Sequence, residues 1–269
     1  MAKANSVKWT REALLIALNL YCKLPFGQLH QNNPVIREIA SRMGRTSSSL
    51  SMKLCNFASL DPLLKARGVA GLTGASKLDR IVWDEFRANR RNVGAESEQL
   101  LHDLFTTDNE REVDFLRTNR IRLEESALEF PPDATEYEAT ILARRGQHFF
   151  RQAVLITYGV RCCISGINVP RLLVASHIKP WRDSTHDRLN PRNGLCLSSL
   201  HDAAFDSGLI TIDEKFRLVI SKRLKTYFPQ PALEQSFLPY EGKAIRLPDR
   251  LAEPDSKLLL YHREKVFSD

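Results

Sequence analysis

The spacing of apolar residues near the start of the chain predicts a helix. Over residues 8–23, the leucines and Tyr21 recur at intervals of three and four, which places them on one helical face. Thr10 suits the N-cap position, because its hydroxyl can accept a hydrogen bond from a free backbone N–H. Pro25 ends the pattern, since the residue before a proline disfavours helical backbone angles. The sequence therefore predicts an amphipathic helix packed against a core.

Residues 33–60 have the pattern of a helix-turn-helix. Asn33 is a suitable N-cap for a first short helix, and Gly44 suits its end, where a left-handed backbone conformation is often needed. Thr46 or Ser47 would then cap a second helix. The outward face of that helix is small, polar and basic, with Ser48, Ser49, Met52 and Lys53. Such a face can enter a DNA major groove, although an ordinary helical hairpin has the same pattern.

The middle of the chain is acidic and ends at a pair of prolines. Residues 91–130 have a helical composition, from which we predict a connecting helix or a pair of helices. The sequence FPPD at residues 130–133 interrupts helical structure and predicts a domain boundary there. Helical spacing returns over residues 135–158.

The C-terminal part alternates short apolar runs with turns. Residues 172–176 predict a strand that ends at His177, and residues 198–205 predict a short helix. The runs 208–213 and 216–221 predict a β-hairpin-like pair. Together with the helical first half, these elements predict an α+β protein.

Charge is unevenly distributed along the chain. The net charge is +7, but residues 1–90 hold 14 Lys/Arg against 6 Asp/Glu. Residues 91–140 hold 5 against 13, and residues 141–269 hold 20 against 13. Basic lobes are typical of proteins that bind a polyanion such as DNA, because each neutralised phosphate releases condensed counterions. A merely basic surface is the alternative.

Composition excludes several classes of protein. No apolar run reaches the roughly 18 residues of a membrane helix, and the N-terminus lacks the features of a secretory signal. The five cysteines are odd in number and contain no CxxC pair, which argues against a disulfide scaffold. We therefore expect a cytoplasmic protein with no membrane partner.

The residues with the clearest chemistry lie between residues 171 and 208. His177 stands at the end of a predicted strand, Asn193 follows a turn-rich loop, and His201 lies on the predicted helix. Hydrolysis of a phosphodiester needs a base that deprotonates water and a cation that stabilises the charged transition state. A histidine, a positioning amide and a metal ligand would be sufficient for this reaction.

The same segment resembles the HNH endonuclease family, which has a ββα-metal fold. It is similar to a bacterial, restriction-type branch of that family through three motifs in order: HIKPW at 177–181, NPRNGLCL at 190–197 and LHDAAFDSGL at 200–209. The resemblance covers residues 135–269. It implies that His177 is the general base, that Asn193 holds the loop and orients the base, and that His201 binds a divalent metal, Mg²⁺ or Mn²⁺.

The chain departs from the family pattern in one position. Many members carry an acidic or histidine metal ligand immediately before the base, whereas this chain has Ser176, a poor ligand for a hard cation. The missing carboxylate could come from Asp206, Asp202 or Asp183, and we favour Asp206.

Several side chains are candidates for DNA contact. In the C-terminal part they are Arg145, Gln147, Arg151, Lys179, Arg182 and Arg192, and in the N-terminal part Ser48, Ser49 and Lys53. Each cation could equally be solvated or paired with a carboxylate.

These observations predict three parts: a helix-turn-helix-like DNA-binding domain (1–90), an acidic helical connector (91–134) and an HNH nuclease domain (135–269). The expected activity is metal-dependent cleavage of double-stranded DNA. The expected setting is restriction or defence against foreign DNA, modified DNA included. One alternative is a DNA-binding regulator with a degenerate nuclease site. Another is a nuclease effector whose N-terminal domain binds a protein. Cutting both strands would suggest a homodimer, since one centre handles one strand.

Overall fold

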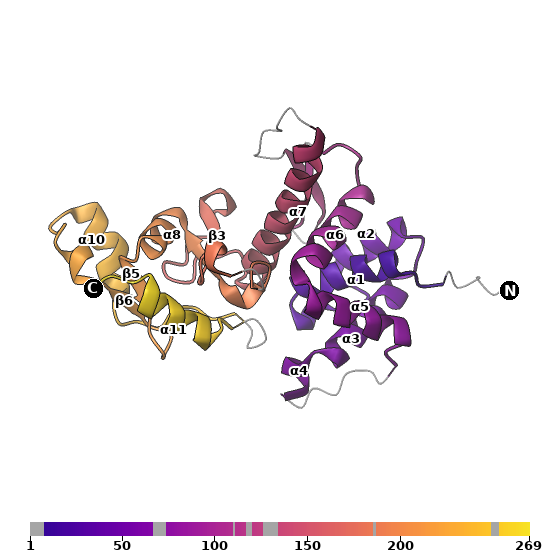
Figure 1. The fold of residues 1–269 in the computed structure, drawn as a ribbon, viewed down its shortest axis with the longest axis horizontal. Coiled ribbons are helices and arrows are strands. Elements are labelled where there is room, and N and C mark those ends of the chain that lie inside the picture. The colour runs from indigo at the N-terminus through magenta and orange to yellow at the C-terminus, as the bar shows by residue number, and fades with distance from the viewer. Residues whose placement is uncertain are drawn as a thin grey trace. The chain divides into compact units, whose positions relative to one another are not determined.

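The computed structural model describes residues 8–66, 74–109, 111–116, 120–125, 134–184, 187–248 and 253–269, with the side chains of 134–139 left aside. The chain divides into two compact units, Met1–Phe149 and Phe150–Asp269 (Figure 1). Among the residues that the structure describes, no helix has both the length and the apolar composition needed to cross a membrane.

The first unit is built mainly from helices around α1. Its elements are α1 (Arg11–Lys23), α2 (Pro34–Arg42), α3 (Ser47–Leu60), α4 (Pro62–Ala66), α5 (Lys77–Ala88), α6 (Arg90–Asp103), β1 (Arg111–Asp114), β2 (Arg122–Glu125) and the start of α7 (Ala134–Thr157). Helix α1 packs against α3, α5 and α6. Leucines 14, 15 and 18 of α1 are fully or almost fully buried, so the apolar face predicted from spacing forms the centre of the core.

The two short helices predicted over residues 33–60 are present as α2 and α3. The Asn33 side chain accepts a hydrogen bond from the Val35 N–H, and the Thr46 hydroxyl accepts one from the Ser49 N–H. Gly44 has φ = +64° between the two helices, a conformation that costs glycine little. The predicted caps and the predicted turn residue therefore set the bounds of α2 and α3.

The prediction of a connecting helix or a pair of helices over residues 91–130 holds for α6 and is wrong for the segment that follows it. Helix α6 is present and packs against α1, but Arg111–Asp114 and Arg122–Glu125 are strands that pair antiparallel, with Val113 opposite Leu123. Val113 and Phe115 are buried while Glu112 and Asp114 are less so, and this two-residue alternation is typical of a strand. The acidic composition suggested a helix, whereas the alternation of apolar residues determined the local structure.

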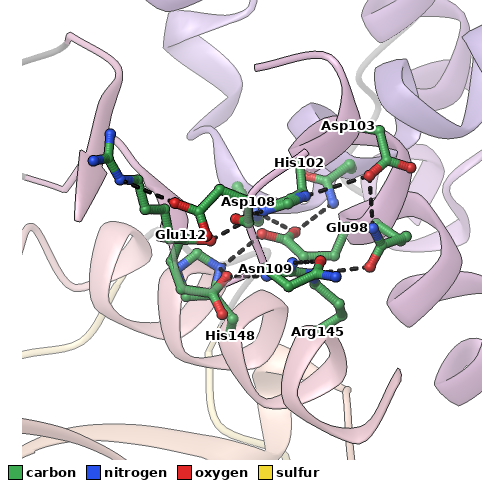
Figure 2. A network of polar contacts seen from close by, with 12 residues as sticks. Glu98, His102, Asp103, Asp108, Asn109, Glu112, Arg145 and His148 are labelled. Atoms are coloured by element: carbon green, nitrogen blue, oxygen red, sulfur yellow. Dashed lines mark hydrogen bonds and ion pairs between the residues drawn. The ribbon is translucent and has the colours of Figure 1, made fainter. Parts of the chain in front are cut away.

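Acidic side chains of the middle segment are neutralised inside the first unit. Glu98 of α6 is 2% exposed and pairs with Lys23 of α1, which is fully buried. The other carboxylate oxygen of Glu98 lies 2.8 Å from Nδ1 of His148 on α7 (Figure 2). Positive neighbours outweigh burial and lower the pKa of Glu98, while burial lowers the pKa of Lys23. This network joins α1, α6 and α7.

Arg145 extends the same network, and its predicted contact with DNA is corrected by this position. The side chain is 2% exposed, and its guanidinium pairs with Glu112 of β1. It also donates to the side-chain oxygens of Gln99, at 2.9 Å, and Asn109, at 3.2 Å (Figure 2). Because these partners use both the charge and the donors of Arg145, we assign it a structural role in holding the hairpin against α7.

The second unit carries two further hairpins and several helices. Its elements are the end of α7, β3 (Leu173–His177), β4 (Gly194–Ser198), α8 (Ser199–Asp206), β5 (Ile210–Ile212), β6 (Leu218–Ile220), α9 (Lys222–Lys225), α10 (Pro231–Phe237) and α11 (Ser256–Lys265). Short 3-10 helices lie at Pro170–Leu172, Trp181–Asp183, Pro191–Asn193 and Leu238–Tyr240. The protein is thus α+β, with a helical N-terminal region and small antiparallel sheets in the C-terminal region.

The β3–β4 hairpin followed by α8 forms the centre of the second unit. Strand β3 pairs antiparallel with β4, so that Ser176 faces Leu195 and His177 faces Gly194. The sequence pattern did not predict strand β4. The reason is that residues 194–198 are buried along their whole length and so show no alternation of apolar and polar side chains. A Cβ on Gly194 would lie 2.4 Å from Cγ2 of Val154, so glycine at this position allows α7 to pack closely on the hairpin.

Candidate functional site: a strand-end histidine beside two carboxylates

His177 is held in place by contacts on three sides. Its ring stacks on Phe150 of α7, with centroids 4.0 Å apart and an interplanar angle of 8°. Trp181 meets it edge-on, with centroids 5.5 Å apart. Its Nε2 lies 2.9 Å from the backbone carbonyl oxygen of Arg188. The position and plane of the imidazole are therefore fixed.

The contacts of His177 leave one nitrogen suited to accept a proton. A carbonyl oxygen only accepts hydrogen bonds, so Nε2 must carry the proton in the neutral ring. Nδ1 then has a lone pair, and no described residue hydrogen-bonds to it. Burial lowers the pKa of His177, partly opposed by the hydrogen bond to Arg188. The ring is therefore neutral at neutral pH, as a general base requires.

Asn193 joins the two ends of the loop that follows His177. Its Oδ1 accepts a hydrogen bond from the Lys179 N–H at 2.8 Å. Its Nδ2 donates to the carbonyl oxygens of Lys179 and Asp187, each at 3.2 Å. The side chain is fully buried, so these contacts replace its hydration completely. Asn193 thus maintains the loop that contains the carbonyl partner of His177, and makes no direct contact with the ring.

Helix α8 carries two carboxylates, of which Asp202 lies beside Ser176, the residue that precedes His177. Asp202 and Asp206 are four residues apart and lie on one side of the helix. Burial and the charge of Asp202 raise the pKa of Asp206 to about 6. Burial also raises the pKa of Asp202, and the neighbouring Ser176 hydroxyl opposes this rise. Neither Oγ of Ser176 nor Oδ1 of Asp202 completes a hydrogen bond, although both atoms are buried.

These donors fit a hard divalent cation better than a soft one. Asp202 and Asp206 supply carboxylate oxygens, and Ser176 supplies a buried hydroxyl beside Asp202. Magnesium is commonly bound by one or two carboxylates, with water and substrate phosphate completing the shell. Over the described ranges, no group of three or more His, Cys, Asp or Glu side chains could hold a metal ion. A structural zinc site made only of protein ligands therefore has no support in those ranges.

The contacts of His201 correct its prediction as a metal ligand. The residue is 2% exposed, and its Nε2 donates to the carbonyl oxygen of Ser236 at 2.9 Å. Its Nδ1 lies 2.7 Å from the Ser198 hydroxyl and 3.7 Å from the Cys162 sulfur. Both ring nitrogens are therefore engaged, and His201 is placed to anchor α8 against the rest of the second unit.

The predicted DNA-contacting cations of the second unit fall into two groups. Arg151 donates to the carbonyls of Leu173 and Pro170, and Arg192 donates to the Glu253 carbonyl and lies 3.6 Å from Asp255. These contacts hold loops together and argue against phosphate binding by either arginine. Arg182 is 86% exposed and Lys179 lies over the ring of Tyr261, so these two side chains remain candidates.

The predicted DNA-contacting residues of the first unit also differ in their surroundings. Lys53 is 13% exposed, and its ammonium donates to both carboxylate oxygens of the buried Asp79, at 2.8 and 3.0 Å, and lies over the Trp9 ring, which argues against its predicted role. Ser48 and Gln147 are exposed, and Ser49 is half-buried. The outward face of α3 is thus less basic than the sequence suggested.

Two residues that hold the base were not identified from sequence. Phe150 provides the stacking surface, and Arg188 provides a backbone carbonyl, which any residue could offer. The sequence does show an aromatic pair, Phe149 and Phe150, but spacing alone does not tell which one meets His177. The sequence favoured Asp206 over Asp202 as the metal ligand. The contact of Asp202 with Ser176 makes Asp202 an equally good candidate.

Comparison with known families identifies this region. The family model described as HNH endonuclease matches residues 162–213, which include β3, β4 and α8. The chain therefore contains an HNH endonuclease domain, which implies phosphodiester hydrolase activity. HNH nucleases act on DNA and are generally metal-dependent.

Other comparisons add little to this identification. A solved structure titled modification dependent TagI restriction endonuclease is similar at 20% sequence identity, with a TM-score of 0.34. The match covers 44% of this chain and 37% of that chain. No curated protein matches the sequence significantly.

Proposed function

We propose that this protein is a divalent-metal-dependent endonuclease that cleaves double-stranded DNA. The observation that carries the proposal is the fixed, neutral His177, whose Nδ1 has no described hydrogen-bond partner. This geometry suits the removal of a proton from water at neutral pH. The carboxylates of Asp202 and Asp206, with the Ser176 hydroxyl, would hold Mg²⁺ or Mn²⁺.

In the proposed reaction, Nδ1 of His177 takes a proton from a water molecule as the water oxygen attacks phosphorus. The bond from phosphorus to the leaving sugar oxygen breaks, and that oxygen takes a proton from solvent. When bound, the cation would stabilise the negative charge of the transition state. Asn193 keeps the loop closed, and the Arg188 carbonyl holds the His177 ring in its reactive tautomer.

DNA recognition is assigned to two surfaces. In the second unit, the exposed Arg182 and the adjacent Lys179 would contact backbone phosphates near the site. In the first unit, the α2–α3 helix-turn-helix would present Ser48 and Ser49 to the major groove. The biological setting that we propose is restriction of foreign DNA. Base modification would be one determinant of specificity. A homodimer would cleave both strands. Support for the setting comes from the series of motifs shared with the restriction-type branch.

The test is cleavage of supercoiled plasmid with Mg²⁺, Mn²⁺ or EDTA, on modified and unmodified DNA. We expect metal-dependent nicking or linearisation by the wild type, and its loss in His177→Ala and Asp206→Asn. Arg223→Gln, an exposed α9 substitution outside the site, serves as the matched control. DNA binding without cleavage under every condition would contradict the nuclease proposal and favour a DNA-binding regulator. Cleavage together with a first unit that lacks salt-sensitive DNA affinity would favour a protein partner for that unit.

A further inference from the structure

Helix α11, together with its N-cap Asp255, contacts three segments that lie close in sequence to residues of the site, although it lies outside the residues matched by the HNH family model. Within the second unit it packs against β5 (Figure 1). Its contacts with the nuclease segments are Asp255 with Arg192, Tyr261 with Lys179, and His262 with Phe205. Arg192 immediately precedes Asn193, Lys179 lies two residues after His177, and Phe205 immediately precedes Asp206.

His262 makes the most extensive of these contacts. It is 1% exposed, and its ring stacks on Phe205 with centroids 3.6 Å apart and an interplanar angle of 11°. Its Nε2 lies 3.1 Å from the Phe205 carbonyl oxygen, so Nε2 is the donor. Its Nδ1 then accepts a hydrogen bond from the Thr211 hydroxyl of β5 at 2.9 Å. A single side chain therefore holds both the ring and the backbone of α8 at Phe205.

The end of α8 is fixed by a second contact with the same C-terminal region. Gly208 has φ = +69°, and a Cβ there would lie 2.1 Å from the Val266 carbonyl oxygen. The Ser268 N–H donates to the Gly208 carbonyl oxygen at 3.0 Å. The last turn of α8, which contains Asp206, thus lies between the His262 ring and the chain that follows α11.

We propose that His262 is a positioning residue of the nuclease centre: it sets the placement of α8, and through it the carboxylates of Asp202 and Asp206 that bind the divalent cation. This inference rests on the proposed function and extends the working site to the C-terminal helix. Groups that orient metal ligands commonly change metal affinity by about 10- to 100-fold when they are removed. His262 makes no contact with either carboxylate and acts only through Phe205 and the helix backbone.

The test uses two substitutions that separate stacking from hydrogen bonding. His262→Phe keeps an aromatic ring against Phe205 but leaves the Phe205 carbonyl and the Thr211 hydroxyl without their partner. His262→Gln offers an N–H donor and an oxygen acceptor attached to one carbon, and the donor and acceptor nitrogens of the neutral imidazole are likewise attached to one carbon. Arg263→Gln is the matched control, because Arg263 lies next along α11 but donates to the Ile212 carbonyl of β5, at 2.9 Å.

The readout is Mn²⁺ affinity of the full chain, measured by electron paramagnetic resonance of free Mn²⁺ without DNA. We expect His262→Phe to weaken Mn²⁺ binding about tenfold, while His262→Gln and Arg263→Gln stay close to wild type. Circular dichroism and a melting curve establish that each variant is folded. Should His262→Phe fail to fold, Thr211→Val removes only the hydroxyl donor, and we expect it to weaken binding about threefold.

The outcomes distinguish this inference from the proposed function. Wild-type protein that binds no Mn²⁺, or binding unchanged by Asp206→Asn, would overturn the metal site and the positioning role together. Binding that depends on Asp206 but is unaffected in folded His262→Phe, or in Thr211→Val where that variant replaces it, would overturn the positioning role alone. An equal loss in Arg263→Gln would show a general effect of α11 and would also overturn the specific role of His262.

Discussion

Replacement of Asn193 by alanine should loosen the loop that supports the catalytic base. The substitution removes three buried hydrogen bonds, one accepted from the Lys179 N–H and two donated to the carbonyls of Lys179 and Asp187. At about 1 kcal/mol for each net hydrogen bond, the free energy of unfolding should fall by about 3 kcal/mol. Buried backbone groups left without partners would increase this loss.

The same substitution should also slow catalysis in the protein that remains folded. The loop between Lys179 and Asn193 contains Arg188, whose carbonyl fixes the His177 ring. A displacement of about 1 Å at a reacting group can lower the rate about 10²-fold. We therefore expect a similar fall in kcat for plasmid cleavage at saturating DNA.

Trp181 offers a local probe of unfolding, since it lies in this loop and contacts His177. Urea unfolding would be followed by its fluorescence in a Trp9→Phe, Trp83→Phe background. Asn190→Ala is the control: Asn190 lies on the same loop but is half-buried, with one side-chain hydrogen bond donated to Asp187, at 3.3 Å, and one accepted from the Arg192 N–H, at 3.2 Å. A loss of less than about 1 kcal/mol in Asn193→Ala, or one equal to that of Asn190→Ala, would refute the bracing role.

Three further predictions follow from the structure. Mn²⁺ affinity should fall as the pH drops through about 6, because protonation of Asp206 removes a ligand charge. Asp202→Asn should move the midpoint of this fall to lower pH, because the charge of Asp202 raises the pKa of Asp206. Mn²⁺ titrations of both proteins between pH 5 and 8 check the prediction. Phe150→Leu should lower kcat about two- to tenfold through loss of the ring contact with His177, measured by plasmid cleavage under saturating DNA. Lys23→Met should destabilise the first unit by about 3–5 kcal/mol, because it leaves a buried carboxylate without its cation, as measured by urea unfolding.

Much of the fold follows from local sequence signals. Caps such as Thr10 and Asn33 bond to the backbone of their own helix, so their effect can be recognised without knowing the tertiary structure. Strands β1 and β2 were mistaken for helix because the acidic composition outweighed the alternation of Val113 and Phe115. Strand β4 was missed because a fully buried strand shows no alternation at all.

The candidate site could be predicted less completely. The order of His177, Asn193 and α8 is a property of the sequence, and the segment was recognised from its motifs. Which cations are already paired is a property of packing, so Arg145 and Lys53 were wrongly treated as free to bind phosphate. The contacts of His201 with Ser236 likewise come from a segment 35 residues away.

Chemical rescue of His177→Gly by imidazole tests the central claim most directly. The substitution removes the base and leaves the stacking surfaces of Phe150 and Trp181. We predict that plasmid cleavage is lost while DNA and Mn²⁺ binding persist, and that added imidazole restores cleavage in a saturable way, increasing with the fraction of neutral imidazole. Undiminished cleavage by His177→Gly, or a loss that imidazole fails to restore although both ligands still bind, would contradict the assignment of His177 as the general base.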